Sequence, residues 1–362
     1  MKILFLANAA SIHTVRWVNA LSERGNEVHL VYKFDDEPKE NIISEKVLQY
    51  RLKYSGTKGY FLNAKQLRNV FNSIKPDVVN AHYASGYGLL ARTARVKSLV
   101  LSVWGSDVYD FPYQSRLKMR IIIDNLRYAN KIASTSESMA QQVRVLLRDN
   151  NKEIFITPFG VDLLRFRKTD KKQSDNIVIG NIKSLQEVYG IEYLVQAIAI
   201  LKQRFEHSGH LDISKKVRVL IYGDGVLRNE LELLTNKLNL HDSITFMGSI
   251  PNSEVPSALG KMDIFCATSN QESFGVSLVE AMAIGLPVVA TDVSGFKEVV
   301  EDGKTGIIVK RKNPQAIAEA LETLIFNSEL RQKYGQNGRT KVEKLYNWED
   351  NVNKMLEIYR AI

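Results

Sequence analysis

The sequence has a single cysteine, Cys266, among its 362 residues. No intrachain disulfide can form, which fits a reducing compartment. Cys266 lies in the apolar stretch 262–267, where a buried, unreactive thiol is expected rather than a nucleophile. No uncharged apolar run approaches the roughly 20 residues that cross a bilayer. The apolar stretch 3–7 is shorter than the roughly 7 to 15 residues of an export signal, so a cytoplasmic protein is expected.

Signatures of nucleic-acid and metal binding are missing as well. The sequence has no zinc-finger spacing, no RNA-binding signature and no interleaving of aromatic and basic residues. His207 and His210 stand in a polar connection with no cysteine or acidic cluster at ligand spacing. We expect neither a nucleic-acid partner nor a zinc ion.

The composition that is present is that of an ordinary globular protein, with 44% hydrophobic and 25% charged residues. A chain of 362 residues exceeds what one hydrophobic core usually supports, so two domains of roughly 150 to 200 residues are expected. The polar stretch 162–176 is predicted to link them. We assign residues 1–165 to an N-terminal domain and residues 175–345 to a C-terminal domain, and expect a helix at 346–362 to pack back on the first.

Apolar strands alternate with helix-length segments in both halves. A strand at 2–8, a helix at 11–24 and a strand at 28–32 form a βαβ unit. Further strands are predicted at 77–81, 98–103, 131–133, 154–156, 177–180, 217–222, 243–247, 263–267, 287–290 and 306–309. The predicted fold is α/β, with two doubly wound Rossmann-like domains facing a deep cleft, where ligands bind beyond the carboxyl ends of the strands.

The net charge of +9 is concentrated in one segment. Residues 51–150 hold 16 lysines and arginines against 6 aspartates and glutamates, which leaves 33 against 34 elsewhere. In the run 116–123, cations alternate with apolar residues. Such a patch can hold anionic lipid headgroups or a phosphorylated acceptor. An ordinary solvated face accounts for it equally well, so contact between residues 51–150 and an anionic membrane is one of two open interpretations.

One helix of the second half has an unusual charge pattern. Between Gly275 and Gly285 the only charge is Glu280, on a segment otherwise apolar nearly all round, and such a helix is normally buried. A buried carboxylate needs a partner. The partner is either a protein cation or backbone N–H groups, or the hydroxyl groups of a ligand. Spacing alone leaves both open.

The turn before this helix is a candidate anion site. Ser273 is predicted to cap the helix, while Phe274 and Gly275 expose backbone N–H groups where the helix dipole favours a diphosphate. Glu272 stands just ahead of it. It is either an ordinary exposed loop glutamate or a group that grips a neutral polyol attached to the phosphate.

These segments resemble a known family. Glu272 and Glu280 are separated by seven residues, of which the first three are Ser273, Phe274 and Gly275. The motif then continues into the run 281–289. Further segments of the chain match segments of the family in the same order: Gly223-Asp224-Gly225, Phe246-Met247-Gly248, Ser294-Gly295 with Glu298-Val299, and Gly303-x-Thr305-Gly306. Over nearly its whole length the chain resembles the retaining nucleotide-sugar glycosyltransferases of family 4 (glycosyl transferases group 1), which have the two-domain GT-B architecture.

The resemblance implies a role for each matching residue. The carboxylate matching Glu280 holds the ribose hydroxyls of the nucleotide, and the one matching Glu272 contacts the transferred sugar. Arg228 stands where a dinucleotide fingerprint has its third glycine, which disfavours a Rossmann dehydrogenase. The expected donor-binding residues are Glu280, Ser273, Phe274, Gly275, Val276, Gly223 and Asp224.

The family usually places two cations after the first strand of the second domain, where they neutralise the departing diphosphate. Lys183 supplies one here, but Tyr189 stands where a lysine is usual. Stabilisation of developing charge is often the largest catalytic contribution. Either Lys183 suffices together with helix N–H groups, or another cation enters from the first domain.

The first domain departs from the family pattern in two places. The family's glycine-rich loop appears as residues 8–14, without paired glycines, and Trp104 stands where the family has a histidine. An indole only donates a hydrogen bond. His82 follows a predicted strand, where a purely structural histidine is the alternative. The expected catalytic residues are Glu272, Lys183, His82 and Asp107, and the expected acceptor-side residues are Ser11, His13 and Trp104.

The activity implied is transfer of a sugar from a nucleoside diphosphate sugar to a saccharide or lipid-linked acceptor, with retention at the anomeric carbon. The expected setting is bacterial surface polysaccharide synthesis, such as lipopolysaccharide O-antigen, capsule or exopolysaccharide, in the cytoplasm or peripherally at the inner face of the membrane. No Asp-x-Asp occurs, so no metal and no cofactor are expected. Two alternatives remain: a nucleotide-sugar epimerase of the same architecture, and a non-catalytic nucleotide-sugar or glycan binding partner.

Overall fold

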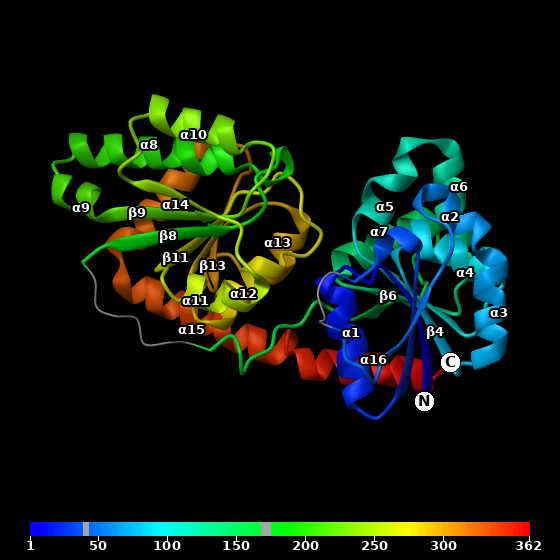
Figure 1. Cartoon of the computed structure of the whole chain (residues 1–362). Helices are drawn as coiled ribbons and strands as arrows, with labels where there is room; N and C mark the ends of the chain where they lie inside the picture. Colours follow the sequence, from blue (N-terminus) through cyan, green and yellow to red (C-terminus); the bar gives the residue numbers. More distant parts are fainter. Residues whose placement is uncertain (39–42, 168–174) are drawn as a thin grey trace. The chain divides into compact units, whose positions relative to one another are not determined.

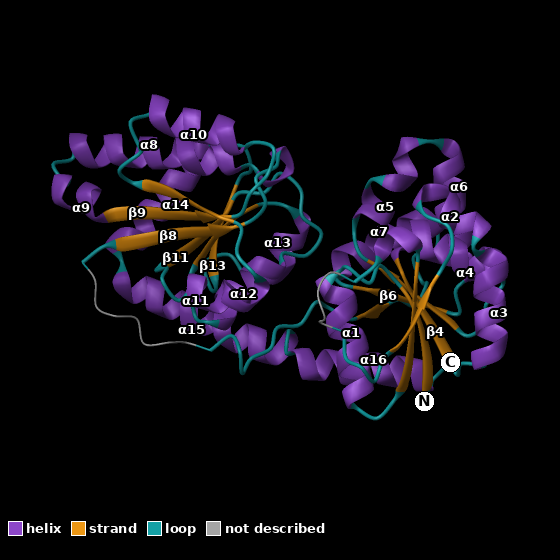
Figure 2. Cartoon of the chain, viewed as in Figure 1, coloured by secondary structure: helices purple, strands orange, loops and turns teal. Residues whose placement is uncertain are grey.

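The computed structural model describes residues 1–38, 43–167 and 175–362 of the chain. The chain forms two compact units: Met1–Pro158 with Glu349–Ile362, and Phe159–Trp348. Each unit contains one parallel sheet with helices packed on it (Figures 1 and 2). Of the predicted linker, residues 162–167 belong to the second unit, and residues 168–174 lie outside the described residues.

The first unit is built on a seven-stranded sheet in the order β3-β2-β1-β4-β5-β6-β7. Its central strands are buried, as expected when helices cover both faces of a parallel sheet. The predictions missed β3 because it is an edge strand whose side chains are mostly exposed and therefore show no apolar run. The strands are β1 (Lys2–Leu6), β2 (Glu27–Tyr32), β3 (Leu48–Arg51), β4 (Val78–His82), β5 (Leu99–Val103), β6 (Lys131–Ser134) and β7 (Phe155–Ile156).

Helices provide the crossovers that parallel strands require. The last helix belongs to this unit from Glu349 onward and buries Val352, Met355, Leu356 and Tyr359. The helices are α1 (Ile12–Glu23), α2 (Gly56–Leu62), α3 (Ala64–Ile74), α4 (Gly88–Ala94), α5 (Ser106–Tyr109), α6 (Arg116–Tyr128), α7 (Glu137–Leu147) and α16 (Trp348–Arg360). Short turns are the 3-10 segments η1 (Phe34–Asp36) and η3 (Phe111–Gln114) and the π-helical turn η2 (Tyr83–Tyr87).

The second unit has a six-stranded parallel sheet in the order β10-β9-β8-β11-β12-β13. Its strands are β8 (Ile177–Ile182), β9 (Val217–Tyr222), β10 (Ile244–Gly248), β11 (Ile264–Ala267), β12 (Val288–Thr291) and β13 (Gly306–Val309). Its helical segments are η4 (Glu187–Tyr189), α8 (Ile191–His207), α9 (Leu211–Lys216), α10 (Arg228–Lys237), η5 (Asn252–Glu254), α11 (Val255–Leu259), α12 (Val276–Ala283), α13 (Ser294–Val299), α14 (Pro314–Phe326) and α15 (Ser328–Leu345).

The strand order reverses once in each sheet, between β1 and β4 and between β8 and β11. In open α/β sheets, ligands bind outside the carboxyl ends of the strands at this reversal. The predicted α/β fold with two doubly wound sheets is confirmed, and each unit has its own candidate binding edge. Within the ranges that the structure describes, no helix combines the length and apolarity needed to cross a bilayer.

Candidate functional site

Lys183 and Glu272 meet at the binding edge of the second unit. Lys183 directly follows β8, and Glu272 lies in the loop between β11 and α12, so they come from the two strands that flank the reversal. Lys183 Nζ donates a hydrogen bond to Glu272 Oε2 at 2.5 Å. The two side chains are only 21% and 14% exposed. Partial exclusion of water strengthens the attraction between their charges.

Tyr189 contacts the same lysine. The Nζ atom of Lys183 lies 4.5 Å from the centroid of the Tyr189 ring. The face of an aromatic ring carries partial negative charge and attracts a cation. Tyr189, which stands where the family usually has a second cation, therefore holds Lys183 against its ring.

The loop that carries Glu272 is fixed at both ends. Asn270 donates from its backbone nitrogen and from Nδ2 to two carbonyl groups of η4, at 2.8 and 2.9 Å. Gly295 N donates to Glu272 O at 3.2 Å, and the Phe274 ring is buried in the core of the unit. Glu272 therefore projects from backbone whose position is set before any ligand arrives.

Two glycines allow backbone segments to approach closely at this edge. Gly223 has a φ of +129°, and a Cβ there would lie 2.0 Å from Lys183 O. A Cβ on Gly295 would lie 2.5 Å from Phe274 N. The adjoining Asp224 is exposed, and its backbone oxygen accepts a hydrogen bond from Leu185 N at 3.0 Å. The structure thus places the expected Gly223-Asp224 segment against the backbone that carries Lys183.

The helix that carries Glu280 differs from the expectation in two ways. Its N-cap residue is Gly275, not Ser273, and α12 begins at Val276. Glu280 is half-buried rather than buried, and it shares a partly exposed face with Val276 and Ser277. Residues four apart lie on one side of a helix, and α12 buries only its other side. The prediction of a buried carboxylate is therefore wrong, and Glu280 instead stands on the partly exposed face of α12.

In the first unit, aromatic rings gather at the carboxyl ends of the central strands. His82, the last residue of β4, is buried, and its ring centroid lies 4.3 Å from that of Trp104 and 4.7 Å from that of Phe5. His13, in the first turn of α1, meets Trp104 edge-on at 5.4 Å. Three of the residues predicted for the acceptor side or for catalysis, His13, His82 and Trp104, thus form one cluster.

Both histidines of this cluster are uncharged at neutral pH. Burial lowers the pKa of His82 well below its ordinary value, and positive charge on His13 would lower that pKa further. Burial, and after it the charge of Arg16, lowers the pKa of His13 to about 4. His82 Nδ1 is buried and has no hydrogen-bond partner among the described residues. The cluster therefore adds no positive charge to this edge at neutral pH.

Asp107 occupies a structural position beside the cluster. Its Oδ1 accepts hydrogen bonds from Trp104 N at 3.1 Å and Gly105 N at 2.9 Å, and its Oδ2 accepts one from Ala84 N at 2.7 Å. Burial raises the pKa of Asp107, while these backbone donors oppose the increase. With both oxygens bonded to backbone donors, the geometry favours a positioning role for Asp107 over the expected catalytic one.

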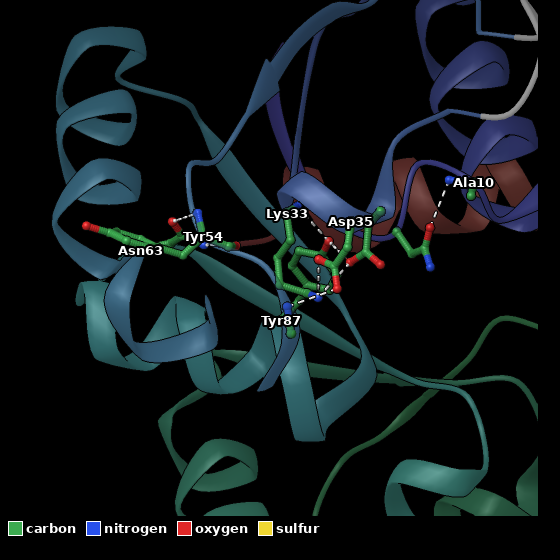
Figure 3. A network of polar contacts seen from close by, with 9 residues as sticks. Ala10, Lys33, Asp35, Tyr54, Asn63 and Tyr87 are labelled. Carbon is green, nitrogen blue, oxygen red and sulfur yellow. Dashed lines mark hydrogen bonds and ion pairs between the residues drawn. The ribbon is translucent and has the colours of Figure 1, made fainter. Parts of the chain in front are cut away.

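Ser11 is the N-cap residue of α1, but its side chain makes no capping hydrogen bond. The turn before it is closed by Asn8, whose Oδ1 accepts from Ala10 N at 2.8 Å (Figure 3). Ser11 N donates to Asn8 O at 3.2 Å. The loop after β1 thus reaches α1 through a side-chain turn, which replaces the expected glycine pair.

Comparison with known proteins identifies the family. Residues 164–341 match the model described as "Glycosyl transferases group 1", and residues 2–136 match the model "Glycosyl transferase 4-like". The chain belongs to the group 1 glycosyltransferases.

Relatives cover up to 97% of this chain. An uncharacterised glycosyltransferase of Methanocaldococcus jannaschii is 25% identical over 97% of this chain and 94% of its own length. The capsular polysaccharide biosynthesis glycosyltransferase CapM of Staphylococcus aureus is 31% identical over 65% of this chain and 57% of its own. Anabaena HepE, solved in complex with UDP and glucose, superposes with a TM-score of 0.80 at 18% identity and covers 100% of both chains. This glycosyltransferase therefore has the GT-B fold.

Tyr83 was not anticipated as a site residue of this glycosyltransferase. It has a φ of +69° and opens the π-helical turn η2, directly after His82. Its ring centroid lies 5.3 Å from that of Trp104. Burial and the nearby charge of Asp107 raise its pKa to about 12, so its hydroxyl stays protonated. Strained backbone and π-helical turns are frequent at functional sites, but neither leaves a signature in a single sequence.

A polar network after β2 was also missed (Figure 3). The buried Lys33 Nζ donates to Asp35 Oδ1 at 2.8 Å and lies 3.4 Å from Asp36 Oδ2. Tyr87 donates to Asp36 Oδ2 at 2.5 Å and accepts from Lys33 N at 3.1 Å. Burial alone would lower the pKa of Lys33, but its bond to Asp35 and the surrounding charges outweigh burial and raise it. Because Ala9 N donates to Asp36 O at 3.0 Å, the network also holds the loop after β1.

Two further observations concern metal-ligating residues and the thiol within the described parts of the chain. No group of three or more histidines, cysteines, aspartates or glutamates there could hold a metal ion. Cys266 is buried in β11, and burial raises its pKa to about 12, so its thiol stays protonated.

Proposed function

We propose that this group 1 glycosyltransferase moves a sugar from a nucleoside diphosphate sugar to a saccharide or lipid-linked acceptor with retention at the anomeric carbon. The observation that carries the proposal is the ion pair of Lys183 and Glu272 at the strand reversal of the second unit, just before the N-terminus of α12. A cation and helix N–H groups suit a diphosphate, and a neighbouring carboxylate suits sugar hydroxyls.

Donor binding in this proposal uses groups that the structure brings together. The diphosphate competes with Glu272 for Lys183 and takes hydrogen bonds from the backbone at residues 274–276. Glu272 is then released to accept hydrogen bonds from the sugar, and Glu280, on the partly exposed face of α12, accepts them from the ribose. Lys183 stabilises the charge that develops on the leaving phosphate oxygen as the bond to the anomeric carbon breaks.

Acceptor binding falls to the binding edge of the first unit. Its uncharged ring cluster contains the buried His82 and Trp104 and the partly exposed His13, and we assign contact with the acceptor, which carries a hydroxyl nucleophile, to His13. Neither histidine is basic enough to take a proton efficiently at neutral pH, so we assign the proton of the attacking hydroxyl to the departing phosphate oxygen. Attack on the face from which the phosphate leaves gives retention.

The setting that we propose is bacterial surface polysaccharide synthesis at the inner face of the cell membrane, without a metal ion or further cofactor. The likeness to CapM, whose name places it in capsular polysaccharide biosynthesis, supports the pathway. HepE was solved with UDP and glucose in the same fold, which supports a nucleotide-linked donor.

The test is nucleotide release from a panel of UDP-, GDP- and ADP-sugars, with and without saccharide acceptors. We expect turnover of one donor class, with loss of turnover in Glu272→Ala and Glu280→Ala, and NMR of the product should show the donor's anomeric configuration. Parent-like turnover in both variants would overturn the site. Epimer formation without an acceptor would point to an epimerase, and donor binding without turnover to a binding partner.

A further inference from the structure

The first unit exposes large apolar side chains within a stretch that is free of carboxylates. Residues 51–75 contain six lysines and arginines and no aspartate or glutamate. Within this stretch, Phe61 and Leu62 at the end of α2 are 49% and 55% exposed, and Tyr54 before α2 is also exposed. Lys58 and Lys65 are exposed on either side of them in the sequence. In the described chain, neither lysine lies within ion-pair distance of a carboxylate.

A second segment also exposes apolar side chains beside cations, although it contains two aspartates, Asp110 and Asp124. Leu117, in the first turn of α6, is 68% exposed, and Tyr113 in η3 is exposed as well. Arg116 and Arg120 flank Leu117, and Arg120 lies 3.9 Å from its one carboxylate neighbour, Asp124. We define the apolar–basic surface by ten of the exposed residues of these two segments: Lys53, Tyr54, Lys58, Phe61, Leu62, Lys65, Tyr113, Arg116, Leu117 and Arg120.

The two segments belong to the same end of the first unit. The chain reaches α2 from the carboxyl end of β3, and reaches η3 and α6 from the carboxyl end of β5. Both α2 and α6 pack against η2, which follows the carboxyl end of β4. The apolar–basic surface therefore borders the edge that carries His82 and Trp104.

The chemistry of this surface matches a lipid bilayer better than a protein. Protein interfaces are depleted in lysine, whereas lysines gain strongly near anionic lipid headgroups. Tyrosine, phenylalanine and leucine among cations are typical of segments that lie in the headgroup region. The Nζ atom of Lys53 lies 5.5 Å from the centroid of the Tyr54 ring, so even this cation and ring are presented together.

We propose that the apolar–basic surface docks the first unit on a bilayer of anionic phospholipid. This docking deepens the proposed function and rests on it in one respect: a lipid-linked acceptor would be presented next to the His82–Trp104 edge. Binding to the bilayer itself needs no turnover, so docking and transferase activity can be tested separately.

The experiment is co-sedimentation with vesicles of phosphatidylcholine alone and of phosphatidylcholine with phosphatidylglycerol. The parent should bind the anionic vesicles and release them at high salt. Each cation near an anionic surface contributes about a fivefold gain in binding, so Lys58→Gln with Lys65→Gln should bind roughly 25-fold more weakly. Phe61→Ser with Leu62→Ser should bind about tenfold more weakly, because the buried apolar area is lost.

The matched control is Lys237→Gln with Leu233→Ser on α10 of the second unit, where Leu233 is 69% exposed and Lys237 is exposed. It should bind vesicles like the parent. Donor turnover in free solution should be unchanged in all three double variants, which also reports that they fold. The proposal is overturned if the parent binds neutral and anionic vesicles equally, if it binds neither, or if the α2 variants bind like the control. Failure of the parent itself to turn over any donor would instead count against the proposed function.

Discussion

Lys183 Nζ and Glu272 Oε2 lie 2.5 Å apart across the reversal of strand order in the second sheet. One partner suits a diphosphate and the other suits a sugar, and a nucleoside diphosphate sugar carries both groups. In the proposed function, the donor therefore competes for each member of the pair. The contact therefore couples Lys183, which we assign to leaving-group stabilisation, to Glu272, which we assign to sugar recognition.

Removing the charge of Lys183 should mainly slow the release of nucleotide. We expect Lys183→Met to lower kcat for donor turnover by about 10²- to 10³-fold, because preorganised charge at a leaving group acts chiefly in the transition state. Lys183→Arg should keep most of the activity. The measurement is steady-state nucleotide release, with exposed Lys237→Met as the control. A Lys183→Met enzyme with parent-like kcat would remove Lys183 from the chemistry.

The same pair should show coupling in stability. Lys183→Met leaves Glu272 half-buried without its partner, and Glu272→Gln does the reverse, so each should destabilise by about 1 to 3 kcal/mol. The double variant should lose less than the sum, since neighbours that interact are not additive. Urea unfolding of the four proteins measures this. Strict additivity would show that the pair contributes nothing to folding.

Tyr189 should act through its ring and not through its hydroxyl. A cation over an aromatic face is worth about 0.5 to 1 kcal/mol at partly exposed sites, so Tyr189→Ala should lower kcat/KM for the donor about two- to fivefold. Tyr189→Phe keeps the ring beneath Lys183 and should behave like the parent. The comparison of Phe and Ala variants in donor kinetics is decisive, because an equal loss in both would assign the effect to the hydroxyl.

A methyl group on Gly295 should distort the loop that carries Glu272. The added Cβ would lie 2.5 Å from Phe274 N, a backbone atom that can move away only if the loop itself moves. We expect Gly295→Ala to lose donor turnover by at least tenfold, as small displacements of positioning groups are costly. Gly338→Ala is the control, because its Cβ would meet only the Met282 side chain, at 3.3 Å. Full activity in Gly295→Ala would show that the loop tolerates displacement.

The sequence predicted most strands because buried parallel strands read as apolar runs between polar segments. It failed at β3, whose residues Leu48–Arg51 form a mostly exposed edge and carry no such run. The family resemblance assigned Lys183 and Glu272 to one donor site, and the fold agrees, because residues after neighbouring parallel strands share one edge of the sheet. Their direct contact depends on side-chain rotamers that spacing does not determine.

Other parts of the candidate site lay beyond reach for distinct reasons. Glu280 was expected to be buried because its neighbours are apolar, yet a short helix covered on one side leaves the other side partly open. The bonds of Asp107 go to backbone donors, which have no residue identity to detect. The positive φ of Tyr83, at the start of η2, leaves no local pattern in the sequence.

Asp107 should matter for the structure of the first unit's edge rather than for proton transfer. In Asp107→Asn one amide nitrogen must face a backbone N–H, so we expect about 1 to 3 kcal/mol of destabilisation from an unsatisfied buried donor. The fluorescence of Trp104 should change with it. Urea unfolding and emission spectra check this, with Asp124→Asn, which loses only a 3.9 Å surface pair, as the control. A stable variant with parent-like emission and no activity would restore a catalytic role.

Acidification should destabilise the first unit through its neutral histidines. The folded-state pKa of His82 lies well below its ordinary value, and that of His13 is about 4. Between these values and an unfolded pKa near 6.5, the unfolded chain binds protons that the folded chain refuses, so stability falls as the pH falls. From pH 7.5 to 5.5, proton uptake by each unfolded imidazole should lower the free energy of unfolding by about 1.4 kcal/mol. Carboxyl groups titrate mostly below this window and contribute little to the change.

The slope of stability against pH separates this effect from any general loss of packing. The side chain introduced in His82→Gln does not titrate, so the unfolding free energy of this variant should fall by about 1.4 kcal/mol less than that of the parent between pH 7.5 and 5.5, even if the variant is less stable at both pH values. His241→Gln, at an exposed position, should keep the parent slope. Urea unfolding at the two pH values gives the answer. Equal slopes in the parent and in His82→Gln would mean that the His82 ring takes up its proton in the folded state. The proposal that the acceptor edge is uncharged would then have to be abandoned.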